Sequence, residues 1–253
     1  MKKAVIITEG EAELIFIRSL LTHIADLSQI SFECIKIHGG RERYVHYEHT
    51  NPVAEVHFQI VNVENDNRVL STIIEREQGF YNKGFERIIG FRDMYSEAYK
   101  DRSPGKIDEN LNIETINATN EAIEDQCIDK NRIGFYFSIM EVEAWFMAMN
   151  QTFRNITDQL TIEMIEEKLG YNLQEIDPEK VIFHPAVALK KILGYAGINY
   201  GKREDQVDKL CANLTLNDYN SAYTEDKCSS YKRFFEEMHN CIENCAVEPL
   251  NTA

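Results

Sequence analysis

The stretch that decides the fold is A-V-I-I-T-E-G-E-A-E, residues 4–13. Its first half, residues 4–8, is short, apolar and rich in β-branched side chains, which is typical of a strand buried on both faces. Gly10 follows almost at once, and residues 11–25 then carry apolar side chains at helical spacing: Leu14, Ile17, Leu20, Leu21 and Ile24. A strand, a tight turn and a helix in this order predict the opening of a βαβ unit.

Four further stretches predict strands. Residues 31–37 and 54–63 alternate between apolar and polar side chains, and residues 85–91 and 132–138 are mainly apolar runs. Helical patterns separate several of them, one carrying Val69, Leu70, Ile73 and Ile74 and another spanning residues 113–128. Strands that alternate with helices favour a largely parallel sheet.

Two segments depart from this pattern. Residues 41–52 are polar and rich in His and Tyr, and we expect them to form a loop. After residue 150 the strand signals fade, and helices are predicted at residues 162–169, 185–193, 205–210 and 231–242. We therefore predict an α/β domain at 1–150, with a Rossmann-like, mostly parallel sheet flanked by helices, and a helical region at 151–253 packed on it.

Composition limits the class of protein. A chain of 253 residues with 43 % hydrophobic residues can bury a sizeable core, and only five prolines and 12 glycines argue against disorder. No apolar run approaches the ~20 residues that cross a bilayer, and the first one is too short for a secretion signal. Six scattered cysteines without a C-x-x-C pair favour free thiols in a reducing compartment. We therefore expect a cytoplasmic protein with no membrane partner.

The net charge of −15 bears on nucleic-acid binding. It disfavours a protein that coats nucleic acid through its overall field. It does not exclude a nuclease, because carboxylates that bind a metal make a site acidic by themselves.

Carboxylates follow three of the predicted strands. Ligands of an open parallel sheet bind at the carboxyl ends of its strands, where turns and helix N-termini gather. Glu9 ends the first strand, with Glu13 just behind it; Asp93 ends the fourth; and Glu141 and Glu143 follow the fifth. Mg²⁺ or Mn²⁺ prefers oxygen ligands of this kind, so we predict a divalent-metal site at this edge of the sheet.

Each of these acids also has a structural interpretation. Glu13 is an acid in the first turn of a helix, a position that the helix dipole favours, and Asp93 could cap the following short helix. Glu141 and Glu143 are two apart on a predicted helix, so we expect at most one to face the metal. Only the convergence of several carboxylates favours the metal site.

Basic residues are candidates for phosphate contacts. Lys190 and Lys191 lie on a predicted helix, and Lys202 follows Tyr200-Gly201 in a predicted loop. Solvated helix faces explain the first two equally well. The segment 41–50 also holds Arg41, Arg43, His46 and His49, whose spacing could serve a metal or a phosphate, although a solvated loop is favoured. No phosphate-binding loop of the G-x-x-x-x-G-K-[ST] type is present, so no ATPase activity is expected.

The order of the acidic motifs resembles a known family. I-I-T-E-G-E-A-E, residues 6–13, resembles the first TOPRIM motif, which implies a catalytic or metal-associated role for Glu9. The second TOPRIM motif is D-x-D; here F-R-D-M-Y supplies Asp93, with Tyr95 in place of the second aspartate. The second aspartate of the usual TOPRIM metal site is therefore absent at this position.

An uncharacterised TOPRIM-like family is more similar. It carries E-G-x-x-E, D-[FY]-Y and E-x-E-[AS] in order, and this chain has E-G-E-A-E, D-M-Y and E-V-E-A-W. P-A-V-A-L-K-K-I-L, Y-G-K and C-S-S-Y-K-R-F-F resemble that family's helical tail. TOPRIM domains occur in topoisomerases, primases, ribonucleases and overcoming-lysogenization-defect nucleases, and related stand-alone proteins accompany an ATPase in bacterial anti-phage systems. The resemblance implies a metal-dependent nuclease.

Two hypotheses follow. The first is a Mg²⁺- or Mn²⁺-dependent nuclease acting on DNA or RNA, with catalytic residues Glu9, Asp93 and Lys202, further metal ligands Glu13, Glu141 and Glu143, and phosphate contacts from Lys190, Lys191 and Lys202. The second is a non-catalytic binding or regulatory module that works with an ATPase partner, which Tyr95 and the acidic net charge favour. The nuclease hypothesis requires Glu9 and Asp93 to converge, and it fails if their side chains point apart or are locked in ion pairs with arginine or lysine. The oligomeric state is left open.

Overall fold

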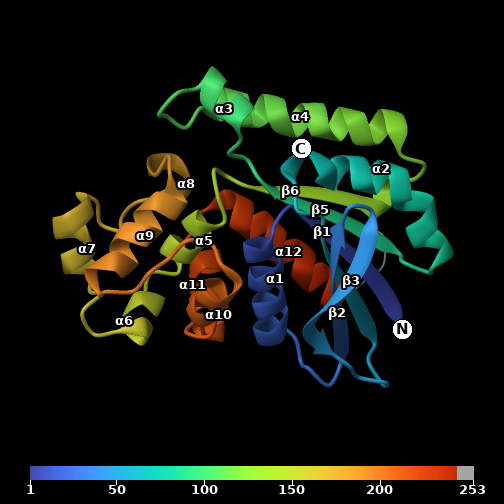
Figure 1. The fold of residues 1–253 in the computed structure, drawn as a ribbon, viewed down its shortest axis with the longest axis horizontal. Helices are drawn as coiled ribbons and strands as arrows, with labels where there is room; N and C mark the ends of the chain where they lie inside the picture. Colours follow the sequence, from blue (N-terminus) through green and yellow to red (C-terminus); the bar gives the residue numbers. More distant parts are fainter. Residues whose placement is uncertain (244–253) are drawn as a thin grey trace.

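The computed structural model describes residues 1–243, which form a six-stranded sheet flanked by helices (Figure 1). The strand order is β3-β2-β4-β1-β5-β6, and all neighbours pair in parallel except β2 and β3. The strands are β1 (Lys2–Thr8), β2 (Ile30–His38), β3 (Arg41–His49), β4 (Val56–Asn62), β5 (Arg87–Asp93) and β6 (Ile133–Ser138). The prediction of a Rossmann-like, mostly parallel α/β fold is confirmed.

Helices cover both faces of the sheet. The first part of the chain contributes α1 (Glu11–Ile24), α2 (Asp66–Asn82), α3 (Glu97–Arg102), α4 (Glu109–Gln126), the short 3₁₀ turn η1 (Lys130–Arg132) and α5 (Glu143–Ala148). Figure 1 shows α2 and α4 on one side of the sheet and α1 on the other. Ala4 and Ile6 of β1 belong to the core on the α1 side, whereas Val5 and Ile7 belong to the core under α2 and α4. The central strand is thus buried on both faces, as its sequence predicts.

The rest of the described chain is helical. It contains α6 (Thr152–Ile156), α7 (Ile162–Leu169), α8 (Pro178–Val181), α9 (Pro185–Tyr195), α10 (Glu204–Cys211), α11 (Leu216–Thr224) and α12 (Ser229–Glu243). Trp145 lies at the centre of their contact with the sheet, its ring centroid 5.5 Å from Phe16, 5.1 Å from Phe91 and 5.3 Å from Tyr231. The C-terminal helices therefore share one apolar core with α1 and the sheet. Within residues 1–243, no helix combines the length and apolar character that a membrane crossing needs.

The prediction of a loop at residues 41–52 was wrong. Residues Arg41–His49 form β3, the antiparallel edge strand, which turns back from β2 through Gly39 and Gly40. Both glycines have positive φ, 56° and 78°, as tight hairpin turns require. An edge strand that is largely open to solvent needs few apolar side chains, and Tyr47 is the one buried residue of β3. The sequence of β3 therefore lacks the apolar pattern by which strands are predicted.

Gly90 in β5 offers a test of the packing that carries Asp93. A Cβ atom at Gly90 would lie 2.5 Å from Phe135 Cδ2 and 2.8 Å from Ile73 Cδ1. Gly90→Ala should therefore reduce the free energy of unfolding by about 1–3 kcal/mol, measured by urea denaturation. Gly79→Ala on the exposed side of α2, where a Cβ meets no atom within 4 Å, should be neutral or stabilising. Equal stability of the two variants would contradict this packing.

Candidate metal centre

The first group of carboxylates lies where two neighbouring parallel strands end. β1 ends at Thr8 and β5 at Asp93, so Glu9 and Asp93 leave the sheet side by side. Glu9, Glu13 and Asp93 each offer a ligand atom, and these atoms all lie within 4.8 Å of one another. The backbone N–H of Asp93 also donates to Glu9 Oε2 at 3.2 Å. The convergence that the sequence predicted is present here.

A second group shares Asp93 with the first. Asp93, Glu141 and Glu143 offer ligand atoms within 4.8 Å of one another. The expectation that at most one of the two glutamates faces this point was wrong. Glu141 precedes α5, in a turn that follows Met140, whose φ is positive at 67°. Residues two apart point to different faces only within a helix, so Glu141 and Glu143 can face the same point.

Lys202 lies among the carboxylates of the second group. Its Nζ is 3.5 Å from Asp93 Oδ2, 3.1 Å from Glu141 Oε1 and 3.0 Å from Glu143 Oε2. It comes from the loop between α9 and α10, where its φ of 58° is left-handed. Burial by itself would lower the pKa of Lys202, but the carboxylates outweigh burial and raise it well above its usual value. The lysine is therefore a permanent cation in the site.

The ion pair bears directly on the nuclease hypothesis. Glu9 and Asp93 do converge, which the hypothesis requires. Asp93 is also paired with Lys202 at 3.5 Å, so the condition that contradicts the hypothesis is met for one of the two residues. Lys202 contacts three carboxylates, those of Asp93, Glu141 and Glu143, so one ammonium does not balance this group without further protons or cations.

Hydrogen bonds orient one oxygen of each carboxylate around Lys202. Asp93 Oδ1 accepts from Ser138 Oγ at 2.6 Å and from the Val142 N–H at 3.0 Å. Glu141 Oε2 accepts from the Ala186 N–H at 2.9 Å, at the start of α9. Glu143 Oε1 accepts from the Tyr200 hydroxyl at 2.7 Å. In Asp93, Glu141 and Glu143 the other carboxylate oxygen faces Lys202 Nζ. The hydrogen bonds therefore orient all three carboxylates toward one positive charge.

Three of the acids are buried, which changes their ionisation. Burial, followed by the charge of Asp93, raises the pKa of Glu13 to about 8. Burial also raises the pKa of Glu143 to about 7, despite the opposing charge of Lys202. Burial raises the pKa of Asp93, against the effects of Lys202 and Ser138. Near neutral pH the centre therefore retains protons that a divalent cation would displace.

Other predicted site residues lie outside this centre. Lys190 and Lys191 are exposed on α9, and neither forms an ion pair within the described part of the chain. Tyr95, which stands where the D-x-D motif has its second aspartate, packs edge-on against Phe183 and His184, with ring centroids 5.9 Å and 5.3 Å away. Tyr95 thus fills a packing position.

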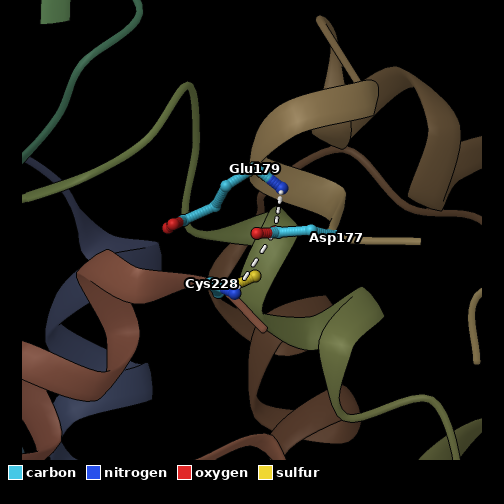
Figure 2. A group of neighbouring side chains, drawn as sticks. All are labelled: Asp177, Glu179 and Cys228. Atoms are coloured by element: carbon cyan, nitrogen blue, oxygen red, sulfur yellow. Dashed lines mark hydrogen bonds between the residues drawn. The ribbon is translucent and has the colours of Figure 1, made fainter. Parts of the chain in front are cut away.

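A separate acidic group has a structural explanation. Asp177, Glu179 and Cys228 also bring candidate ligand atoms within 4.8 Å of one another. In Figure 2 the Asp177 carboxylate accepts from the backbone N–H groups of Glu179 and Cys228, at 3.0 Å and 3.2 Å, while the Glu179 carboxylate points away. Glu179 accepts instead from Trp145 Nε1 at 2.8 Å and from the Ser230 N–H at 3.2 Å. The group ties α8 to the start of α12.

Comparisons with protein-family models, curated proteins and solved structures gave no match. The interpretation of the site therefore rests on its own geometry. Fold and site together define a Rossmann-like α/β protein with a buried carboxylate centre at the carboxyl edge of its sheet.

The raised pKa values predict how stability depends on pH without metal. The ordinary pKa of a glutamate is 4.5, so Glu13 and Glu143 lose their protons above this pH in the unfolded chain. In the folded protein they keep their protons up to their raised pKa values of about 8 and about 7. In EDTA the free energy of unfolding should therefore fall as pH rises from about 5 to about 8. Glu13→Gln should reduce this slope in urea titrations, and the exposed control Glu175→Gln should not. An unchanged slope for Glu13→Gln would contradict the burial of a protonated Glu13.

Proposed function

We propose that this protein is a divalent-metal-dependent phosphodiesterase acting on DNA or RNA. The observation that carries the proposal is the meeting of Glu9, Glu13 and Asp93 at the ends of two adjacent parallel strands, beside the cation of Lys202. Carboxyl edges of parallel sheets are where ligands of such folds bind. A cluster that combines several carboxylates with a fixed lysine suits a substrate with negatively charged oxygens.

The donor set fits Mg²⁺ or Mn²⁺. Each candidate ligand atom is a carboxylate oxygen, which hard divalent cations prefer. Glu9, Glu13 and Asp93 would hold the ion, because Lys202 lies closer to Glu141 and Glu143, at 3.1 Å and 3.0 Å, than to Asp93, at 3.5 Å. A bound ion would polarise a phosphoryl oxygen or lower the pKa of a water molecule.

The protein's own groups would position the substrate and balance its charge. Lys202 remains charged at neutral pH and is one-third exposed, so it can approach a phosphoryl oxygen while it contacts the carboxylates. Asp93 is held by Ser138 and by a backbone N–H, which fixes it before substrate binds. Glu13, with a pKa near 8, can exchange a proton near neutral pH and is the candidate acid or base if it does not bind the ion.

The TOPRIM resemblance supports the same activity. Glu9 and Asp93, the two residues that it implies as functional, belong to the same cluster. Within this proposal the protein is a bacterial cytoplasmic enzyme, and an anti-phage effector that works with an ATPase partner is the setting that the resemblance suggests.

Two observations favour a second function. Lys202 contacts three carboxylates, and Tyr95 packs where the motif has an aspartate, so the cluster could serve only to join the C-terminal helices to the sheet. The protein would then be a non-catalytic binding or regulatory module. Metal binding separates the two functions, because a purely structural ion pair needs no divalent cation.

Thermal melting in Mg²⁺ or Mn²⁺ provides the first test. An ion at a hundred times its dissociation constant should stabilise the fold by about 2.7 kcal/mol, because it binds only the folded state. Glu9→Gln and Asp93→Asn should weaken this stabilisation, and Glu175→Gln should leave it intact. If neither ion shifts the melting temperature, the non-catalytic module is favoured.

Cleavage assays provide the second test. Purified protein should degrade plasmid, single-stranded DNA or tRNA in Mn²⁺ but not in EDTA. Glu9→Ala should abolish cleavage with an unchanged circular dichroism spectrum, and Lys202→Ala should slow it by roughly 10²–10³-fold, as expected for loss of one preorganised electrostatic group. Full activity of Glu9→Ala would remove Glu9 from the mechanism.

A further inference from the structure

The helical region contains a cavity of about 580 Å³, lined by residues of α6, α9, α10 and the loop 196–203 (Figure 1). Part of its wall is apolar: Leu193 of α9 and Leu210 of α10 are buried, and Ile156 and Ile198 are partly exposed. Pockets that hold small organic ligands measure roughly 300–1,000 Å³ and are mainly apolar, with a few polar groups that orient the ligand. The cavity has the size and the apolar wall of such a pocket.

Amide side chains supply hydrogen-bonding groups on the cavity wall. Gln206 Oε1 accepts from the Gly201 N–H at 2.7 Å, and Asn213 Nδ2 donates to the Lys209 carbonyl at 2.7 Å. The other atom of each amide, Gln206 Nε2 and Asn213 Oδ1, makes no hydrogen bond to another residue within 1–243. The wall therefore offers one donor and one acceptor. The polar edges of nucleobases carry both kinds of group, and amide side chains pair with them.

Lys209 gives the cavity one unbalanced positive charge. The other two charged residues of the wall, Arg203 and Asp205, are paired with each other at 3.6 Å. Lys209 is exposed and forms no ion pair with any residue that the structure describes. It follows Gln206 by three residues on α10, so both side chains lie on the same face of the helix. This charge suits a ligand with a single anionic group.

The cavity shares a wall with the loop that carries Lys202. Tyr200 lines the cavity, is 3 % exposed, and donates its hydroxyl to Glu143 at 2.7 Å. Gln206 holds the backbone of Gly201, the residue before Lys202. Lys202 itself and the carboxylates of the metal centre do not line the cavity, so the two sites are distinct. A ligand in the cavity would therefore contact side chains that position the centre, without entering it.

We propose that this cavity binds a nucleoside monophosphate. The base would lie against the apolar wall and form hydrogen bonds with the Gln206 and Asn213 amides, and the phosphate would pair with Lys209. One unbalanced cation matches one phosphate group better than a chain of three. The bound nucleotide would stabilise the loop 196–203 in the conformation that places Lys202 in the centre, so it would act as an effector. The proposal does not depend on the phosphodiesterase activity.

Isothermal titration calorimetry with AMP, GMP, CMP and UMP, in EDTA, tests the cavity in the absence of metal. At least one nucleotide should bind, and its nucleoside or inorganic phosphate alone should bind more weakly, because each makes only part of the contacts. Lys209→Ala should weaken nucleotide binding about tenfold or more, the loss expected for one charge-assisted hydrogen bond. The same variant should bind the nucleoside as the wild type does, because the nucleoside has no phosphate.

Two further variants serve as the matched control and as a steric block. Lys83→Ala removes another exposed lysine that forms no ion pair within residues 1–243, at the end of α2, and should bind as the wild type does. Ala212→Trp places a large ring at an exposed position of the cavity wall and should abolish binding with an unchanged melting temperature. The proposal is overturned if no nucleotide binds the wild type, if Lys83→Ala loses as much affinity as Lys209→Ala, or if folded Ala212→Trp binds normally.

Glu9→Gln and hydrogen exchange locate the bound nucleotide and test its effect. Glu9 belongs to the metal centre and does not line the cavity, so Glu9→Gln should bind the nucleotide normally in EDTA. Loss of binding in Glu9→Gln, with normal binding in Lys209→Ala, would place the nucleotide in the metal centre and overturn the proposal. Hydrogen exchange of the loop 196–203 should slow when the nucleotide binds, and unchanged exchange would contradict its role as an effector.

Discussion

Buried negative charge is the constraint on which this structure depends. Five carboxylates meet at the carboxyl edge of the sheet, and three of them, Glu13, Asp93 and Glu143, are buried. Burying an unbalanced charge is costly, so the chain brings Lys202 to within 3.0–3.5 Å of Asp93, Glu141 and Glu143. Opposite charges about 4 Å apart interact with about 4 kcal/mol at the dielectric typical of a protein surface. The loop that carries Lys202 joins α9 to α10, so this attraction also holds the helical region against the sheet.

The turn after β1 shows how backbone geometry serves the same site. Gly10 has a φ of −145°, which any residue can adopt, so backbone strain does not explain the glycine. A Cβ atom at this position would lie 2.5 Å from Glu13 Oε2. Glycine therefore leaves room for the Glu13 carboxylate to fold back over the turn. The E-G-x-x-E pattern is in this sense one unit, in which the glycine makes space for the second acid beside the first.

Part of this arrangement could be predicted from the sequence. β1 and β5 were recognised as short, mainly apolar runs, and the rule that parallel strands share a carboxyl edge then brings together Glu9 and Asp93, the acids that follow them. The place of Lys202 could not be predicted, because it depends on how a distant loop returns to the sheet. Tyr200 and Ser138 were missed for the same reason, since their hydrogen bonds to Glu143 and Asp93 span 57 and 45 residues. β3 was missed because solvent-facing edge strands lack a clear apolar period.

Anomalous diffraction from crystals soaked in Mn²⁺ tests the metal centre most directly. We expect a peak between the carboxylates of Glu9, Glu13 and Asp93, with Lys202 still beside Glu141 and Glu143. If crystals soaked in saturating Mn²⁺ show no peak at the carboxyl edge and Lys202 keeps its ion pairs, the metal centre is contradicted. These acids would then have a purely structural role.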